Sequence, residues 1–544
     1  MDVLHRNNNA MHKSHYDLSS MRSLRLAPIL LVLLTAGCDT KPSVAEPPAT
    51  GEVEVEVEVE VEQRADMPDS PDMTESRVSP TVDQILPDEL QGFWQPWRGD
   101  FDGMVERRVI RVLTTYGGYQ FYYEEGRPHG ATYDMLKAFE NYLNAELGRK
   151  NIRIHVLPIP VSRDQLFPAL LAGNGDLVAS DLTPTKERQA QIDFTRPLLD
   201  DIDEVIVTGE SVTGIERIED LSGREIFVRQ TSSYYEHLQS LAATFAEKQL
   251  APPILVPADE LLEAEDIVEM ISLGEIDITV MDDYKAEFWA GVLPGIKVRT
   301  DLEIKSGGSI AWALRKESPL FAEQLEAFLK KYGKGSLFGN DTYNRYLAKA
   351  ARARCAKAPV FSENIEQLIT LFSKYGEQYS IDWLRLAAQA YQESGLKQNR
   401  VSPAGAIGIM QIKPSTAADK HIGIDDVSGL EDNIHAGTKY LRFLETRYFS
   451  DDGFTELDQW LFSLAAYNAG PAKINRYRRE AEKKGYDPNV WFDNVEIIAA
   501  QRIGRETVTY VSNIFKYYVA YQLTAGRRQE HDERFGNILV ACNE

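Results

Sequence analysis

An apolar run that ends at a single carboxylate is the strongest constraint on how this chain can fold. Between Ile381 and Tyr391 the apolar side chains recur at the i, i+3, i+4 and i+7 spacing of a helix with one buried face. Glu393 leaves that face, and a Ser/Pro/Gly-rich turn and the compact sequence GIMQ follow it. The pattern predicts a core helix that carries Glu393, followed by a loop that faces a cleft.

The position of Glu393 gives it a chemical possibility. A carboxyl group partly withdrawn from water is disfavoured in its charged form, so its pKa rises and it can hold a proton near neutral pH. A general acid that acts on a glycosidic oxygen needs this property. A Glu near a helix end can instead be a cap or an ion-pair partner, and its position alone leaves both roles open.

Four motifs follow one another in this part of the chain: QES at 392–394, SPAGAIGIMQIKPSTA at 402–417, AAYNAG at 465–470 and ETVTYV at 506–511. Together they resemble the catalytic domain of soluble lytic transglycosylases (SLT). In that family the Glu of the ES pair is the sole catalytic acid and base, which implies this role for Glu393. The resemblance also implies substrate contacts for seven other residues: Ser402, Met410, Gln411, Tyr467, Asn468, Glu506 and Tyr510.

Core packing is the alternative role for Met410, Tyr467 and Tyr510. The two roles can coexist, because sugar-binding clefts use aromatic and methionine surfaces. The resemblance implies cleavage of peptidoglycan between N-acetylmuramic acid and N-acetylglucosamine with a 1,6-anhydro product. A hydrolysing muramidase and a receptor that only grips peptidoglycan stay open as alternatives. The acidic residue that follows Glu393 in the sequence is Asp419, so the loop between them offers no second catalytic carboxylate.

Composition narrows the class of protein. The chain has 544 residues, 43% of them hydrophobic, which is enough for several domain cores. A net charge of −24 argues against a nucleic-acid partner. The nine His and three Cys form no CxxC or HExxH arrangement, so neither a metal nor another cofactor is expected.

The amino terminus has the layout of an export signal. Two arginines, an apolar stretch and small residues precede Cys38, as in a bacterial lipobox. We predict a signal peptide at 1–37, with translation starting at Met21 as a possibility, and lipidation of Cys38. Ordinary cleavage with Cys38 as a bystander is the alternative. The protein is therefore expected in the cell envelope, facing the periplasm and lipid-anchored, with the outer membrane favoured over the inner.

Residues 38–95 are predicted to be an acidic disordered linker. Between 39 and 90 there are fifteen acidic and only three basic residues, and like charges at this density extend a chain. The alternating GEVEVEVEVEVE run could instead form an edge strand. In the oxidising envelope Cys355 and Cys542 could pair as a disulfide, which we treat as a hypothesis.

Residues 100–335 alternate β-rich segments with amphipathic helices, which predicts an α/β fold with mainly parallel strands. The segment DLTPTKERQAQIDFTRPLL at 181–199 resembles family 3 extracellular solute-binding proteins, and further matches begin at Leu221, Gly274 and Ser309. This resemblance implies a periplasmic-binding-protein-like domain of two lobes. A small molecule, an amino acid or a muropeptide, would lie between the lobes and regulate the enzyme.

The same resemblance implies a set of ligand contacts. Thr183 and Arg188 would hold a ligand carboxylate, since the planar fork of Arg suits it. Thr231 and Ser232 would supply hydroxyl donors and Asp282 would meet a ligand ammonium. The alternative for Arg188 is a surface ion pair with Glu187 or Asp193. Gln230 stands where the family usually has Gly, which leaves the backbone contacts open.

A connector is predicted at 336–358 and the catalytic domain at 359–544. Nearly every segment after Phe361 has the pattern of a helix, and Gly470 with Pro471 ends one of them. The expected fold is therefore multidomain: an α/β two-lobed periplasmic-binding-protein-like domain followed by a mostly α lysozyme-like domain. A solute-binding domain, an SLT domain and a lipobox in one chain resemble the membrane-bound lytic transglycosylases.

Overall fold

The computed structural model describes residues 95–117, 119–124, 127–333, 345–346 and 363–535. All of them belong to one compact unit, Asp69–Glu544. The predicted signal peptide, the lipidation of Cys38, the acidic linker, most of the connector and the Cys355–Cys542 pair lie outside the described residues. Within these ranges no helix has the length and apolar character needed to cross a bilayer.

The first lobe is built on three parallel strands in the order β4-β1-β5. The bounds are β1 Val109–Thr114, β4 His155–Pro160 and β5 Leu177–Leu182, with helices α3 Phe101–Arg107, α4 Ala131–Glu146, α5 Arg163–Ala172, α6 Lys186–Gln191 and α10 Pro319–Tyr332, and a hairpin of β2 Tyr122–Glu124 and β3 Arg127–His129. Phe139, Phe321 and Phe328 fill the core between α4 and α10. These elements confirm the predicted α/β alternation.

Two long strands cross from the first lobe into the second. They are β7 Leu199–Gly209 and β11 Ile296–Leu314, which pair antiparallel. The sheet order is β10-β7-β11-β5-β1-β4, and the short β6 Asp193–Phe194 also pairs with β11. The prediction of mainly parallel strands is therefore wrong for this sheet. The central strands β7 and β11 extend through both lobes, and they run in opposite directions.

The second lobe carries the remaining strands, and β8 and β9 pair in parallel. The bounds are β8 Glu225–Arg229, β9 Ile254–Ala258 and β10 Ile278–Asp282, with helices α7 Ser233–Glu247, α8 Ala264–Leu273 and α9 Asp283–Ala290 and a short turn η2 Ile218–Leu221. Ser232 caps α7, because its hydroxyl accepts a hydrogen bond from the Tyr235 backbone N–H. This cap fixes the start of a helix whose Glu236 forms an ion pair with Arg188 of the first lobe.

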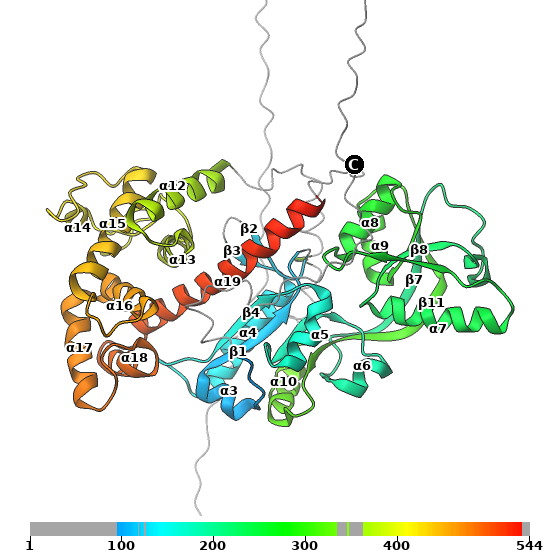
Figure 1. The fold of residues 1–544 in the computed structure, drawn as a ribbon, viewed down its shortest axis with the longest axis horizontal. Coiled ribbons are helices and arrows are strands. Elements are labelled where there is room, and N and C mark those ends of the chain that lie inside the picture. Colours follow the sequence, from blue (N-terminus) through cyan, green and yellow to red (C-terminus); the bar gives the residue numbers. More distant parts are fainter. Residues whose placement is uncertain (1–94, 118, 125–126, 334–344, 347–362, 536–544) are drawn as a thin grey trace, which may run out of the picture. The chain divides into compact units, whose positions relative to one another are not determined.

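The carboxyl-terminal domain, residues 363–535, is helical, as expected (Figure 1, yellow-green to red). The bounds are α12 Glu363–Tyr379, α13 Trp383–Ser394, α14 Pro414–Ala417, α15 Leu430–Tyr448, α16 Glu456–Ala469, α17 Pro471–Lys483, η3 Trp491–Val495, α18 Glu496–Arg502 and α19 Arg505–Phe535. Asp382 caps α13 and Gly395, at φ 67°, ends it. Gly470 and Pro471 separate α16 from α17, which confirms the predicted break.

The helical domain packs against the first lobe through α19 and α18. Lys516 of α19 donates to Glu140 at 3.0 Å and Arg108 donates to Glu496 at 2.7 Å. One continuous buried core includes side chains from β4 and from α19. In addition, the Arg127 guanidinium donates to the carbonyl of Gly395 at 2.6 Å. The end of the helix that carries Glu393 is therefore held partly by the first domain.

Candidate active site and ligand pocket

Glu393 lies in the last turn of α13 and is half-buried. Tyr510 reaches it from α19, and the tyrosine hydroxyl donates a hydrogen bond of 2.6 Å to Oε1. The Tyr510 side chain is buried, so this hydrogen bond is shielded from water. Since Oε1 already accepts from the tyrosine, Oε2 is the oxygen left to carry an exchangeable proton.

Burial raises the pKa of Glu393 to about 7. The Tyr510 hydroxyl and the exposed Arg400 guanidinium both lower that pKa, but they do not offset the desolvation. Among the residues that the structure describes, no second carboxylate contributes to it. Glu393 is thus a single carboxyl group that exchanges its proton near neutral pH.

Gln389 is a site residue that the sequence reasoning did not identify. It lies one turn before Glu393 on α13, is fully buried, and its Nε2 is 3.4 Å from the Tyr510 hydroxyl. A glutamine on the apolar face of a helix was a detectable signal, because a buried amide needs a partner. Gln389 orients Tyr510, which in turn contacts Glu393.

The loop after α13 is fixed by its own hydrogen bonds. Ser402 forms a tight turn with Ala406, in which the Ser402 N–H donates to the Ala406 carbonyl at 2.8 Å and the Ser402 hydroxyl accepts from the Ala406 N–H at 3.0 Å. The Gln411 amide donates to the carbonyls of Arg400 and Gly408 at 3.0 and 2.8 Å. Gly408 has φ 80°, and a Cβ there would lie 2.2 Å from the Asn433 side chain. The glycine of GIMQ is therefore required by a close approach.

The side chain of Met410 is fully buried and packs over Gly437 of α15. This burial fits the core-packing role, and a contact between the Met410 side chain and substrate stays a prediction. Only the Met410 carbonyl faces a site residue, since it accepts from the Tyr467 hydroxyl at 2.9 Å.

The remaining predicted residues lie around the two helix ends beside Glu393. Tyr467, half-buried at the end of α16, has a pKa well above its usual range because of burial and the nearby Glu393. Asn468 is exposed and accepts from the Thr507 hydroxyl at 2.6 Å. Glu506 is exposed in the first turn of α19, and no described side-chain hydrogen bond joins it to Glu393.

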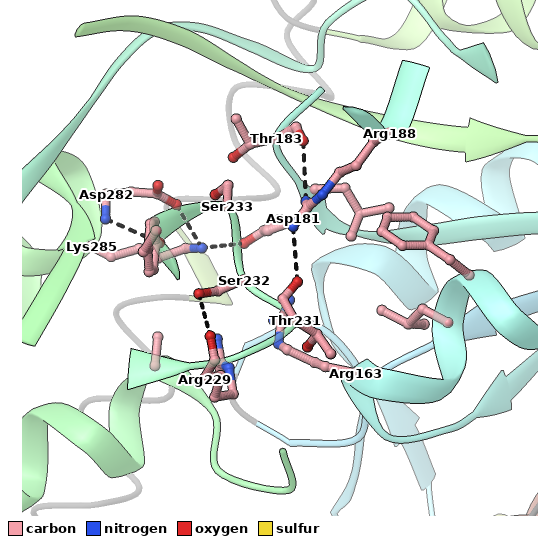
Figure 2. Close-up of a pocket in the computed structure, with 15 residues that line it drawn as sticks. Arg163, Asp181, Thr183, Arg188, Arg229, Thr231, Ser232, Ser233, Asp282 and Lys285 are labelled. Carbon is pink, nitrogen blue, oxygen red and sulfur yellow. Dashed lines mark hydrogen bonds and ion pairs between the residues drawn. The ribbon is translucent and has the colours of Figure 1, made fainter. Parts of the chain in front are cut away.

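A second site lies in the first domain. A pocket there is lined by all five residues predicted to bind a ligand: Thr183, Arg188, Thr231, Ser232 and Asp282 (Figure 2). Both lobes contribute to this lining, and the role of these five residues in ligand binding stays a prediction. The sequence reasoning missed four charged residues that line the same space: Arg163, Asp181, Arg229 and Lys285.

The chain's own groups occupy the predicted ligand contacts. Neither Glu187 nor Asp193 pairs with Arg188 in the described structure, and its partner is Glu236 of α7 at 2.8 Å. The Thr231 hydroxyl donates to Glu260 and the Ser232 hydroxyl donates to the Arg229 carbonyl. Asp282 contacts Lys285 at 3.0 Å. Arg188, Thr231, Ser232 and Asp282 therefore each already have an internal partner.

Neither site holds a set of metal ligands. Among the described residues no group of three or more His, Cys, Asp or Glu side chains is arranged to bind an ion.

Comparisons with known proteins agree with these two sites. Residues 370–490 match the transglycosylase SLT domain and residues 109–347 match the family 3 bacterial extracellular solute-binding proteins. The chain therefore joins a two-lobed solute-binding-like α/β domain to a helical SLT domain. The SLT match ends before Glu506 and Tyr510.

Similar proteins share most of the chain. A protein of Desulfosudis oleivorans named membrane-bound lytic murein transglycosylase F is 29% identical over 426 residues, 75% of this chain and 89% of the relative. A protein of the same name from Shewanella woodyi is 29% identical over 433 residues, 76% of this chain and 85% of the relative. Among solved structures, an ancestral arginine-binding protein bound to arginine is 24% identical and covers 44% of this chain and 98% of its own, with a TM-score of 0.36.

Proposed function

We propose that this chain, a homologue of the proteins named membrane-bound lytic murein transglycosylase F, is a lytic transglycosylase of peptidoglycan. The observation that carries the proposal is the state of Glu393. It is a half-buried carboxyl group with a pKa of about 7, bonded to Tyr510 and without a second carboxylate acting on it. An enzyme that uses one group first as acid and then as base needs such a pKa.

The proposed mechanism uses Glu393 twice. Protonated on Oε2, it gives its proton to the glycosidic oxygen between N-acetylmuramic acid and N-acetylglucosamine. The N-acetyl group of the substrate stabilises the positive charge that develops at C1, in a substrate-assisted reaction. The ionised Glu393 then takes the proton of the C6 hydroxyl, whose oxygen attacks C1. The product is a 1,6-anhydro-N-acetylmuramic end, and no water is consumed.

We assign the surrounding residues to substrate positioning. Tyr510 donates to Glu393 and stabilises the ionised carboxylate between the two proton transfers. Ser402, Gln411, Tyr467 and Asn468 are proposed to contact the glycan. Glu506 would do so only from the exposed first turn of α19, and Met410 contacts Tyr467 through its carbonyl.

The two alternatives make different demands on the site. A glycosidase with two carboxylates needs a second Asp or Glu roughly 5 to 9.5 Å from the first. No second carboxylate is among the groups that shift the pKa of Glu393, which agrees with a transglycosylase that uses one carboxyl group. A receptor that only grips peptidoglycan has no need of a carboxyl group with a raised pKa.

The test is mass spectrometry of the muropeptides that the purified protein releases from sacculi. The transglycosylase predicts anhydro ends, all of which disappear in Glu393→Gln. Reducing ends would identify a hydrolase. Release of nothing by the wild type, together with retained binding to sacculi, would favour the receptor.

We further propose a location and a regulatory role. The protein faces the periplasm in the cell envelope, and lipidation of Cys38, with the outer membrane favoured, would anchor it. The domains are assigned as 100–335 and 359–544, with the connector between them. A small carboxylate-bearing molecule, an amino acid or a muropeptide, would bind between the lobes and change the transglycosylase rate. Constant turnover despite measured binding would refute this coupling.

A further inference from the structure

Three ion pairs join the two lobes across the ligand pocket. They are Arg163–Glu263 at 2.6 Å, Arg188–Glu236 at 2.8 Å and Lys285–Asp181 at 3.1 Å. In each pair one partner comes from the first lobe and the other from the second. The side chains of Arg188 and Lys285 are only 8% and 6% exposed, so these pairs are shielded from solvent and screened little by salt.

The guanidinium of Arg188 is satisfied on three sides by the chain itself. Nε donates to Glu236 at 2.8 Å, Nη1 to the Thr183 carbonyl at 3.2 Å and Nη2 to the Thr231 carbonyl at 2.8 Å. The ring of Phe167 packs on its face. A ligand carboxylate needs two parallel donors from this fork. To gain them it must displace oxygens that are already bound.

Asp282, the predicted partner of a ligand ammonium, also already has a partner within the chain, the ammonium of Lys285. Figure 2 shows its ammonium between the carboxylates of Asp181 and Asp282, at 3.1 and 3.0 Å. Burial alone disfavours the charged amine, but the two carboxylates hold its pKa well above the usual range. Asp282 is the residue that the sequence assigned to a ligand ammonium, so an internal ammonium already occupies that contact.

We propose that Glu236 and Lys285 together act as a built-in pseudo-ligand of the first domain. The carboxylate of Glu236 and the ammonium of Lys285 occupy the two groups that would recognise an amino acid, Arg188 and Asp282, and they close the lobes without an external molecule. The inference rests on the proposed ligand-binding role of this domain and adds a mechanism to it. An external ligand binds by competition, so a free amino acid binds the wild type weakly.

The competition can be removed one charge at a time. Glu236→Gln keeps the shape of the side chain and frees Arg188 from its carboxylate, and the side chain is 27% exposed, so the substitution is tolerated. Lys285→Gln frees Asp282, although it leaves two buried carboxylates uncompensated. Glu219→Gln is a matched control, because Glu219 forms an exposed ion pair with Lys248 on the same lobe, away from the pocket.

The experiment uses the full chain and the twenty free L-amino acids as probes, with Kd values from calorimetry. At least one probe should bind Glu236→Gln about tenfold more tightly than it binds the wild type and Glu219→Gln, because the ligand no longer competes with a charged hydrogen bond. Lys285→Gln, where it folds, should show the same direction. Hydrogen exchange without ligand should be faster at α6 and α7 in Glu236→Gln than in Glu219→Gln, since the closed state loses a cross-lobe pair.

Two outcomes would overturn the pseudo-ligand. If a probe binds the wild type tightly and Glu236→Gln does not improve its affinity, the ligand domain stands but Glu236 is no competitor. A second outcome is that neither the wild type nor any variant binds a probe, and that hydrogen exchange at α6 and α7 is equally fast in Glu236→Gln and Glu219→Gln. In that case both the pseudo-ligand and the amino-acid-binding role are wrong. Neither measurement involves turnover, so the transglycosylase proposal is judged separately by the muropeptide products.

Discussion

In the helical domain Glu393 accepts a hydrogen bond from a tyrosine, and no cation among the described residues hydrogen-bonds to it, whereas in the first domain Asp181 contacts Tyr119, Tyr284 and the ammonium of Lys285. Burial pushes the pKa of both carboxyl groups upward. For Glu393 burial prevails and the pKa rises to about 7, while for Asp181 the nearby Lys285 holds the pKa below its usual value. The cationic partner therefore decides whether a buried carboxyl group exchanges protons or closes a domain.

The largest expected effect concerns turnover. Glu393→Gln should lower the rate of anhydromuropeptide release by about 10²- to 10⁴-fold, because the amide cannot donate or accept the proton. The matched control is Glu431→Gln, which removes an exposed carboxylate of α15 that pairs with Lys374. If the rate of Glu393→Gln were within threefold of the control's rate, Glu393 would not be the proton donor, and its contrast with Asp181 would fail.

The corresponding substitution in the first domain is expected to change the stability of that domain and not the rate of turnover. Asp181→Asn should lower the free energy of unfolding of the first domain by roughly 3 kcal/mol at pH 7, because a buried ion pair loses one partner. The folded-state pKa of Asp181 is depressed, so its stabilisation is present above the unfolded pKa and is lost as the pH falls through the folded value. The difference from wild type should therefore shrink in acid. Urea unfolding at pH 7 and pH 3 checks this, and an equal difference at both pH values would contradict it.

Glu393 should show the opposite pH dependence. Its folded-state pKa is raised from 4.5 to about 7, so its stabilisation is complete below the unfolded pKa and is lost as the pH rises through 7. Glu393→Gln should match the wild type at pH 4 and exceed its stability at pH 8 by about 3 kcal/mol. Thermal unfolding at the two pH values measures this, and a less stable variant at pH 8 would show that Glu393 has a stabilising ionic partner.

The smallest expected effect concerns the hydrogen bond that Tyr510 donates to Glu393. Tyr510→Phe removes the hydrogen bond that stabilises the ionised Glu393, so the pKa of Glu393 should rise further. The alkaline limb of the kcat/KM profile should move to higher pH and kcat should fall roughly tenfold, the loss expected for one hydrogen bond to a charged group. A lower kcat with an unmoved pH profile would mean that Tyr510 has only a packing role.

Much of this architecture could be predicted from local sequence. The apolar periodicity before Glu393 gave the helix, and Gly470 with Pro471 gave a helix end, because these signals depend on a few neighbouring residues. The motifs likewise pointed to the five pocket residues, because a motif is also made of a few neighbouring residues. The antiparallel pairing of β7 and β11 was missed, because strand direction is set by which distant segments meet.

The charges that decide the chemistry were harder to predict. Glu236 and Arg188 are 48 residues apart, and Lys285 and Asp181 come from different lobes, so no sequence spacing connects them. Gln389 could have been found as a buried amide on an apolar face. The burial of Met410 against Gly437 was visible only once α15 was placed. Ion pairs and close packing are tertiary properties, and motif residues alone do not report them.

The most direct test of the account is the titration of Glu393 itself. Carbon-13 labelling of Glu carboxyl groups and NMR spectra between pH 4 and pH 9, with Glu393→Gln to assign the resonance, give its pKa in the ligand-free enzyme. The account predicts a pKa of about 7, well separated from the exposed glutamates. A pKa near 4.5 would mean that Glu393 is ionised at neutral pH and cannot be the proton donor, which would contradict the proposed reaction.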